Sequence, residues 1–174
     1  RLIVLLLIGL GVRILTLSLP GTADMLTNQI WGAWTVEKGV TRTYILTDAD
    51  YLTKAVLFWR HLPYHSPPPM AQTELGTLDH VPNYPPLSVY SFWLSAWAAK
   101  AIQGGRLRPG SILNACFNVL PLLGALGIVM VAWRFLQAEG VAQPWWILSA
   151  FWMNPAFLLH SPVLGYVDAV FAFL

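Results

Sequence analysis

The first carboxylate of the chain stands where a membrane enzyme could use it. Asp24 lies five residues after Leu19, the end of the first long apolar stretch, and aromatic residues follow it. A carboxylate at a membrane surface could act as general base for an acceptor hydroxyl while the second substrate arrives from the lipid. The alternative is that Asp24 caps the next helix, because aspartate is favoured in that position. Spacing alone favours the cap.

Two further groups of polar residues could bind ions. Asp48 and Asp50 have the spacing to share a divalent cation with phosphate oxygens, although a pair of helix caps is the favoured interpretation. His61 and His65 are four residues apart, but Pro63 between them disfavours the helix that a metal site of this spacing needs. A divalent cation is the one cofactor that the sequence suggests, and it assigns no metal ligand.

Two charges fall inside apolar sequence. Arg13 interrupts the first apolar stretch, where a guanidinium requires a partner, a water-filled cavity or a path to the membrane surface. Asp168 follows Gly165 in an apolar run and is a second candidate for a functional charge in the membrane, or else a carboxylate at a helix end.

The composition of the chain is unusually apolar, and this indicates which structural elements carry these residues. The 174 residues are 56% hydrophobic and only 10% charged, with a mean hydropathy of +0.58, whereas soluble domains are about 25% charged. This excludes a disordered chain and a coiled coil, and the single cysteine, Cys116, excludes a disulfide scaffold. The net charge of +2 is too small to suggest a nucleic-acid partner. We therefore expect an all-α integral membrane protein.

The apolar stretches predict about four to five transmembrane helices in one module, since a span needs about 20 residues. The sequence begins and stops inside apolar sequence, which suggests the amino-terminal fragment of a larger multi-pass protein. The expected spans, the last one incomplete, are 2–19, 86–102, 112–136, 145–160 and 163–174.

The segment 21–85 differs from the rest, because it holds most of the acidic residues and is long for an idle connection. We expect it to be an extracytoplasmic loop that carries two short amphipathic helices at the membrane interface, Met25 to Lys38 and Asp50 to Arg60. The short loop after the second span is basic, with Arg106 and Arg108, and so is predicted to face the cytoplasm.

Several motifs in this order resemble one enzyme family. The chain is similar to the amino-terminal module of glycosyltransferases of the GT-C superfold that use polyprenyl-phosphate sugars, in particular their bacterial mannosyltransferase-like branch. The resemblance covers nearly the whole chain and depends on Thr22-Ala23-Asp24, Trp31, Trp34, Gly39, Tyr44, Asn83-Tyr84-Pro85-Pro86-Leu87, Asn154-Pro155 and Gly165-Tyr166-Val167-Asp168.

The resemblance implies an inverting transfer of a hexose, mannose or another, from a polyprenyl-phosphate donor to a lipid, glycan or protein hydroxyl. It makes Asp24 the catalytic base and Asp168 the later acid near the active site, in a bacterial plasma membrane protein whose fragment is inactive alone. Met25 and Tyr166 depart from the family pattern and leave the donor open. Candidates for substrate binding are Arg42, Lys54, Arg60, His80 and Tyr84.

Two alternatives stay open at this point. If every predicted span crosses fully, Asp168 lies near the cytoplasmic side, opposite Asp24, and a shared site needs a short or re-entrant stretch around Pro155 and Pro162. The other functional class is a non-enzymatic transporter or lipid-handling subunit, in which both carboxylates are structural or line a permeation path.

Overall fold

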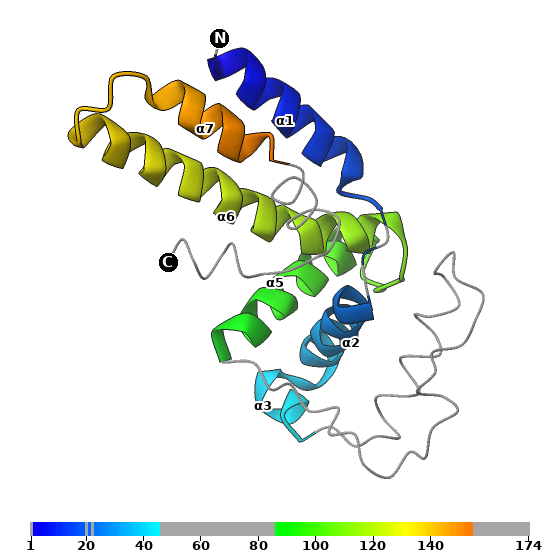
Figure 1. The fold of residues 1–174 in the computed structure, drawn as a ribbon. Helices are drawn as coiled ribbons and strands as arrows, with labels where there is room; N and C mark the ends of the chain where they lie inside the picture. The colour runs from blue at the N-terminus through cyan, green and yellow to red at the C-terminus, as the bar shows by residue number, and fades with distance from the viewer. Residues whose placement is uncertain (1, 20, 22, 46–85, 155–174) are drawn as a thin grey trace.

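The computed structural model describes residues 2–19, 21, 23–45 and 86–154, and in these ranges the protein is all-helical (Figure 1). Helices make up 80% of the described residues, which contain no strand. The expected all-α fold is confirmed for this part of the chain. In chain order the helices are α1 (Leu2–Thr16), α2 (Ala23–Lys38), α3 (Val40–Thr43), α5 (Pro86–Ile102), α6 (Ser111–Ala138) and α7 (Pro144–Trp152).

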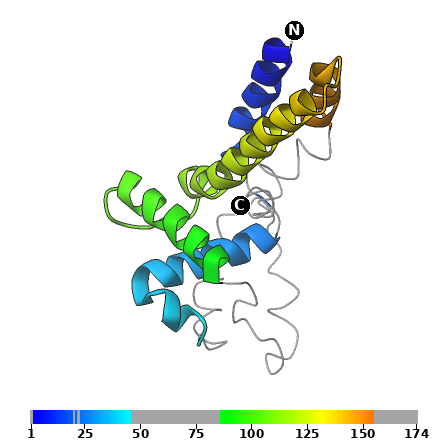
Figure 2. The ribbon, with the colours of Figure 1, turned by 90° about the vertical axis from the view of Figure 1, so that its left-hand side faces the viewer.

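Helix α6 is the element that the two packing groups of the structure share. Its amino-terminal part joins α2 and α5 in a core that includes Ile30, Phe92 and Phe117. Its carboxyl-terminal part packs with α1 and α7 around Trp152 and Val129. Figure 2 shows the two groups at opposite ends of α6, with α1 and α7 beside its later turns.

The length and composition of α6 would allow it to cross a membrane. It has 28 residues and includes the predicted span 112–136, and 28 helical residues extend about 42 Å, against a hydrocarbon core of about 30 Å. The described residues contain no second helix of this kind. The four to five spans expected from the sequence are therefore not shown, and only one possible span is.

The other apolar stretches form shorter helices than expected. Helix α5 has 17 residues and coincides with the predicted span 86–102, whereas α1 has 15 residues and ends before Leu19. Helix α7 has only nine residues, with Pro144 at its start, and so covers about 14 Å. The predicted span 163–174 lies outside the described residues.

The basic loop between α5 and α6 is closed by a side chain. The amide of Gln103 donates a hydrogen bond of 2.9 Å to the carbonyl oxygen of Arg108 and accepts one of 2.6 Å from the Arg108 backbone N–H. Gly104 and Gly105 both have positive φ, 73° and 88°, a conformation that glycine adopts without steric cost. The loop therefore presents Arg106 and Arg108 as exposed side chains.

Helix α2 is buried more deeply than an interfacial helix would be. The sequence predicted a helix from Met25 to Lys38 at the membrane surface, and the helix exists, from Ala23 to Lys38. Met25 and Ile30 are almost wholly buried, at 1% and 0% exposure, in the core shared with α5 and α6. Its apolar face is therefore covered by protein. The second predicted interfacial helix, Asp50 to Arg60, lies outside the described residues.

Candidate functional site

Asp24 is the second residue of α2, which begins at Ala23. It therefore lies in the first turn, where the positive end of the helix dipole favours a negative charge. The side chain of Asp24 is outside the described residues, so the backbone alone gives its position.

The helix that carries Asp24 is held firmly against α5 at Gly32. A Cβ atom on Gly32 would lie 2.7 Å from the backbone oxygen of Phe92 and 2.7 Å from Cζ of Phe117. Only a residue without a side chain allows α2 and α5 to approach this closely. Trp31 adds an aromatic contact with Phe92, at 6.1 Å between ring centroids. The backbone of α2 is thus held in place by the core at Trp31 and Gly32.

A cluster of amide side chains, Gln29, Asn114 and Asn118, joins α2 and α6 to the end of α1. Gln29 donates a hydrogen bond of 2.9 Å to Oδ1 of Asn114, and the Nδ2 group of Asn114 donates one of 3.2 Å to the carbonyl oxygen of Ser18. Asn118 donates one of 2.8 Å to the carbonyl oxygen of Leu17. All three side chains are buried. Asn114 and Asn118 thereby satisfy the carbonyl groups of Leu17 and Ser18, in the turn that follows α1.

The amide cluster was not among the features predicted from the sequence, although the spacing of two of its residues indicates it. Asn114 and Asn118 are four residues apart inside an otherwise apolar stretch, which places both on the same face of a helix. Buried amides in an apolar helix require hydrogen-bond partners, so a pair at this spacing indicates contact with another polar segment. The partner on α2, Gln29, could not be identified from spacing.

These hydrogen bonds conflict with the predicted orientation. Asn114 is the fourth residue of α6 and lies just after the basic loop, yet it binds the carbonyl of Ser18 at the end of α1. The end of α1 and the loop 103–110 therefore lie at the same end of α6. The charge pattern predicts that the end of α1 and the loop 103–110 face opposite sides of a membrane. If α1 and α6 both cross the membrane in this arrangement, the two segments face the same side instead.

Arg13 is buried, with 0% exposure, and its partners lie on α1 and α7. Its Nη1 donates to the carbonyl oxygen of Gly9 at 3.1 Å and its Nη2 to that of Trp152 at 3.0 Å. The guanidinium carbon also lies 3.6 Å from the centroid of the Trp152 ring, a close cation–π contact. The sequence left a partner, a water-filled cavity or a path to the membrane surface as alternatives for Arg13, and the structure shows partners. Through these contacts Arg13 joins α1 to α7.

Among the candidates for substrate binding, the structure describes Arg42 alone. Arg42 lies on α3, one short turn after α2, and its side chain is exposed. Gly39, with φ of 90°, forms the junction between the two helices. The remaining predicted residues lie outside the described part of the chain: Asp48, Asp50, Lys54, Arg60, His61, His65, His80, Tyr84 and Asp168. Within the described ranges no group of three or more His, Cys, Asp or Glu side chains could hold a metal ion.

Comparisons with known proteins add no relative. No protein-family model, no curated protein and no solved structure matches the chain. The function must therefore be argued from the motifs of the sequence and the geometry of the described residues.

Proposed function

We propose that this chain is part of a membrane glycosyltransferase that moves a hexose from a polyprenyl-phosphate donor to an acceptor hydroxyl, with Asp24 as general base. In this reaction Asp24 takes the proton of the acceptor hydroxyl while its oxygen attacks the anomeric carbon. The bond from that carbon to the phosphate oxygen breaks, its electrons leave with the polyprenyl phosphate, and the configuration inverts.

The observation that carries the proposal is the position of Asp24 in the first turn of α2, directly after α1. The helix dipole stabilises a carboxylate there in its ionised form, which is the form that accepts a proton. The close packing of α2 on α5 at Gly32 supplies the rigidity that a catalytic group needs. The resemblance of Thr22-Ala23-Asp24 and the later motifs to the GT-C glycosyltransferases supports the same assignment.

A cation near the base would stabilise the departing phosphate. Arg42 does not suit this role, because α3 follows the carboxyl end of α2, whereas Asp24 lies at its amino end. The 16 residues of α2 extend about 24 Å between them. An arginine can pair with two phosphate oxygens at once, so the predicted cations in 46–85, Arg60 among them, are the candidates for this role.

The apolar surface of the described residues supports the membrane setting. Exposed apolar side chains cover the outer faces of α1 and α6, including Leu7 at 60%, Leu15 at 80%, Met130 at 69% and Phe135 at 61%. Soluble monomers rarely expose apolar areas of this extent. Lipid, or further helices in the membrane, would cover these faces. The proposed enzyme is thus an integral membrane protein, with α6 as a span.

The substitution Asp24→Asn tests the proposal in the full-length protein, with a polyprenyl-phosphate hexose as donor. Asparagine preserves size and hydrogen bonding but cannot take a proton, so turnover should fall by roughly 100-fold or more. Expression and thermal stability should stay near those of the wild type. If Asp24→Asn retains near-normal turnover, Asp24 is structural and Asp168 becomes the next candidate for the base.

A matched control lies on the same helix. Glu37, in the last turn of α2, is exposed, and Glu37→Gln removes one carboxylate from α2 without touching its first turn. Its turnover should stay close to that of the wild type. Asp48→Asn and Asp50→Asn should also be milder than Asp24→Asn if those residues cap a helix. Equal losses in all four variants would contradict a specific role for Asp24.

A further inference from the structure

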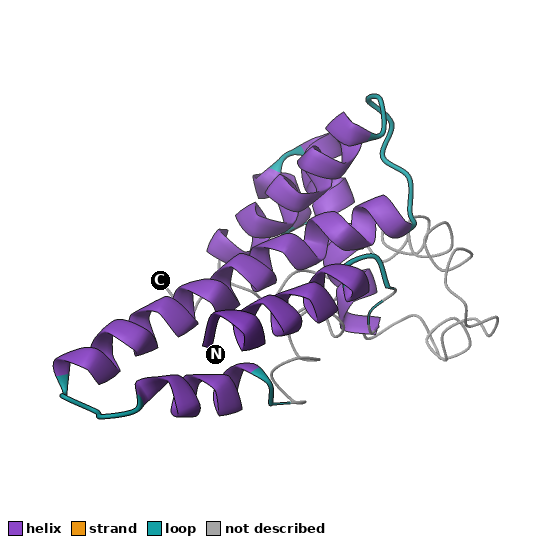
Figure 3. Ribbon diagram, turned by 90° about the horizontal axis from the view of Figure 1, so that it is seen from above, coloured by secondary structure: helices purple, strands orange, loops and turns teal. Residues whose placement is uncertain are grey.

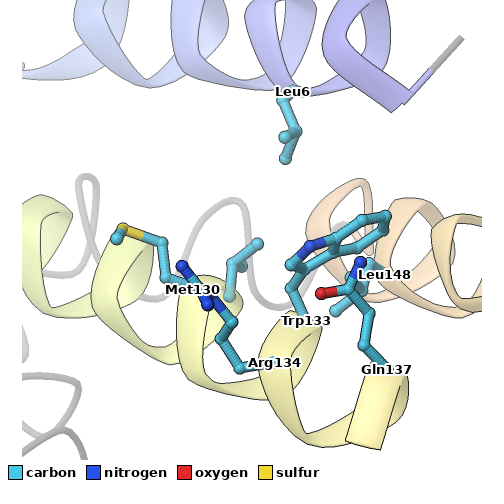
Figure 4. A pocket seen from close by; sticks show the side chains of 7 residues that line it. Leu6, Met130, Trp133, Arg134, Gln137 and Leu148 are labelled. Atoms are coloured by element: carbon cyan, nitrogen blue, oxygen red, sulfur yellow. The ribbon is translucent and has the colours of Figure 1, made fainter.

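A pocket of about 580 Å³ lies between α1, α6 and α7, at the end of α6 remote from the helix that carries Asp24 (Figure 4). Its volume falls within the roughly 300–1,000 Å³ typical of ligand pockets. Figure 3 shows α1, α6 and α7 running alongside one another in this region. The pocket is therefore separate from the proposed catalytic site.

The walls of the pocket divide into an apolar part and a polar part. Leu6 points into it from α1, and Val129, Met130 and Leu148 contribute further apolar surface (Figure 4). The polar side chains are Trp133, Arg134 and Gln137, all on the last turns of α6. The guanidinium and the indole N–H only donate hydrogen bonds, and the Gln137 amide can also donate. No carboxylate is among the described residues that line the pocket, so its polar part favours an anion.

The position along α6 indicates which anion. Arg134 follows Asn114 by about 20 residues, or about 30 Å of helix, which equals the thickness of the hydrocarbon core. If Asn114 lies near one membrane surface, then Trp133, Arg134 and Gln137 lie at the headgroup level of the opposite leaflet. Tryptophan and arginine are both favoured at that depth. A phospholipid headgroup would meet the donors there while its acyl chain enters between Leu6 and Met130.

We propose that this pocket binds one phospholipid with an anionic headgroup, such as phosphatidylglycerol, with Arg134 as the residue that selects the charge. Exposed apolar side chains close in sequence to the lining residues Leu6 and Met130, including Ile3 at 70% and Val131 at 58%, provide a lipid-facing surface from which an acyl chain enters. The binding site rests on the membrane placement of α6 given in the proposed function, and does not depend on glycosyl transfer.

The test measures lipid retention by the full-length protein in detergent. The protein is exchanged from mixed micelles with equal phosphatidylglycerol and phosphatidylcholine of the same acyl chains, and retained lipid is counted by native mass spectrometry. We expect one phosphatidylglycerol retained in preference to phosphatidylcholine. Arg134→Gln should weaken this retention roughly tenfold, the usual scale for a hydrogen bond to a charged group. The exposed Arg106→Gln in the α5–α6 loop is the matched charge control and should behave as the wild type.

A second pair of variants tests the apolar half of the pocket. Leu6→Trp fills the space that an acyl chain would occupy and should lower retention of both lipids. Leu7→Trp adds the same bulk at the next residue, which is 60% exposed and does not line the pocket, and should leave retention unchanged.

Several results would overturn the proposal. These are equal retention of the two lipids, wild-type retention by Arg134→Gln, an equal loss in Arg106→Gln, and displacement of phosphatidylglycerol by a polyprenyl phosphate at equal concentration. If the lipid-retention experiment gives one of these results and Asp24→Asn is inactive, the glycosyltransferase proposal still stands. Vesicle flotation of the wild type shows separately whether the protein enters a bilayer.

Discussion

Two glycines on α1, two residues apart, give the sharpest test of the packing between α1 and α7. A Cβ atom on Gly9 would overlap the indole Nε1 of Trp152 and lie 2.6 Å from its Cδ1. A Cβ atom on Gly11 would have nothing within 4 Å. Gly9→Ala and Gly11→Ala therefore make the same chemical change on the same helix, once against a neighbour and once into open space.

The expected effects of the two substitutions have opposite signs. In a helix interior, alanine is more stable than glycine by about 1 kcal/mol, which Gly11→Ala should gain in full. At Gly9 the indole must move, which costs about 1–3 kcal/mol of overpacking. The movement also disrupts the hydrogen bond from Nε1 of Trp152 to the carbonyl of Leu6, 3.2 Å long, and the contact with Arg13, together worth about 1–3 kcal/mol. After the gain in helix propensity is subtracted, Gly9→Ala should destabilise the fold by about 1–5 kcal/mol.

The assay is reversible unfolding in mixed micelles, with helix content followed by circular dichroism as the denaturing detergent is increased. The midpoint should rise for Gly11→Ala and fall for Gly9→Ala. In a Trp152→Phe background the smaller ring leaves room for a methyl group, so the penalty of Gly9→Ala should shrink, as a double-mutant cycle would reveal. If Gly9→Ala is as stable as Gly11→Ala, α1 and α7 do not pack through this contact.

Two more outcomes follow from the described residues. In a Cys116→Ala background, Leu19→Cys and Gly105→Cys should react with an impermeant thiol reagent from the same side of the membrane, because the hydrogen bonds of the amide cluster place the end of α1 beside the α5–α6 loop. Labelling from opposite sides would refute that arrangement and support the orientation given by the basic loop, with Asp24 outside. Burial, and then the nearby Tyr90, raise the pKa of Tyr44 above its usual 10.0. As the pH rises, Tyr44 then ionises in the unfolded chain before it ionises in the folded one. Its contribution to stability should therefore be complete below pH 10 and be lost as the pH rises through the folded pKa. Unfolding measured at alkaline pH should show a smaller loss of stability for Tyr44→Phe than for the wild type.

The helical character of the chain was predictable, and its packing was not. The apolar runs at 86–102 and 112–136 correspond to α5 and α6, because hydrophobic length is a local property that the sequence displays directly. The burial of α2 was not predictable in the same way. Its mixture of Trp31 and Trp34 with polar residues suits a membrane interface as well as a protein core, and only the partner helix decides between them.

The candidate site shows the same division. The sequence singled out Asp24 from its position after an apolar stretch, and α2 indeed begins at the residue before it. It could not foresee that Arg13 would meet Trp152, since the two are 139 residues apart. Nor does spacing reveal that Gln29 reaches Asn114 across 85 residues. Contacts between distant residues depend on how helices are arranged, which charge and hydropathy constrain only weakly.

The partners of α1 have a consequence for how the protein is made. The hydrogen bonds that α1 and the turn after it accept from other helices come from Asn114, Asn118 and Trp152, which follow their acceptors by 96, 101 and 146 residues. At a synthesis rate of about 5–20 residues per second, the first of these partners leaves the ribosome roughly 5–20 seconds after the end of α1. During that interval Arg13 has Gly9 on its own helix but lacks the carbonyl and the ring of Trp152. The nascent helix would need water, lipid headgroups or the insertion machinery to shelter its guanidinium until α7 arrives.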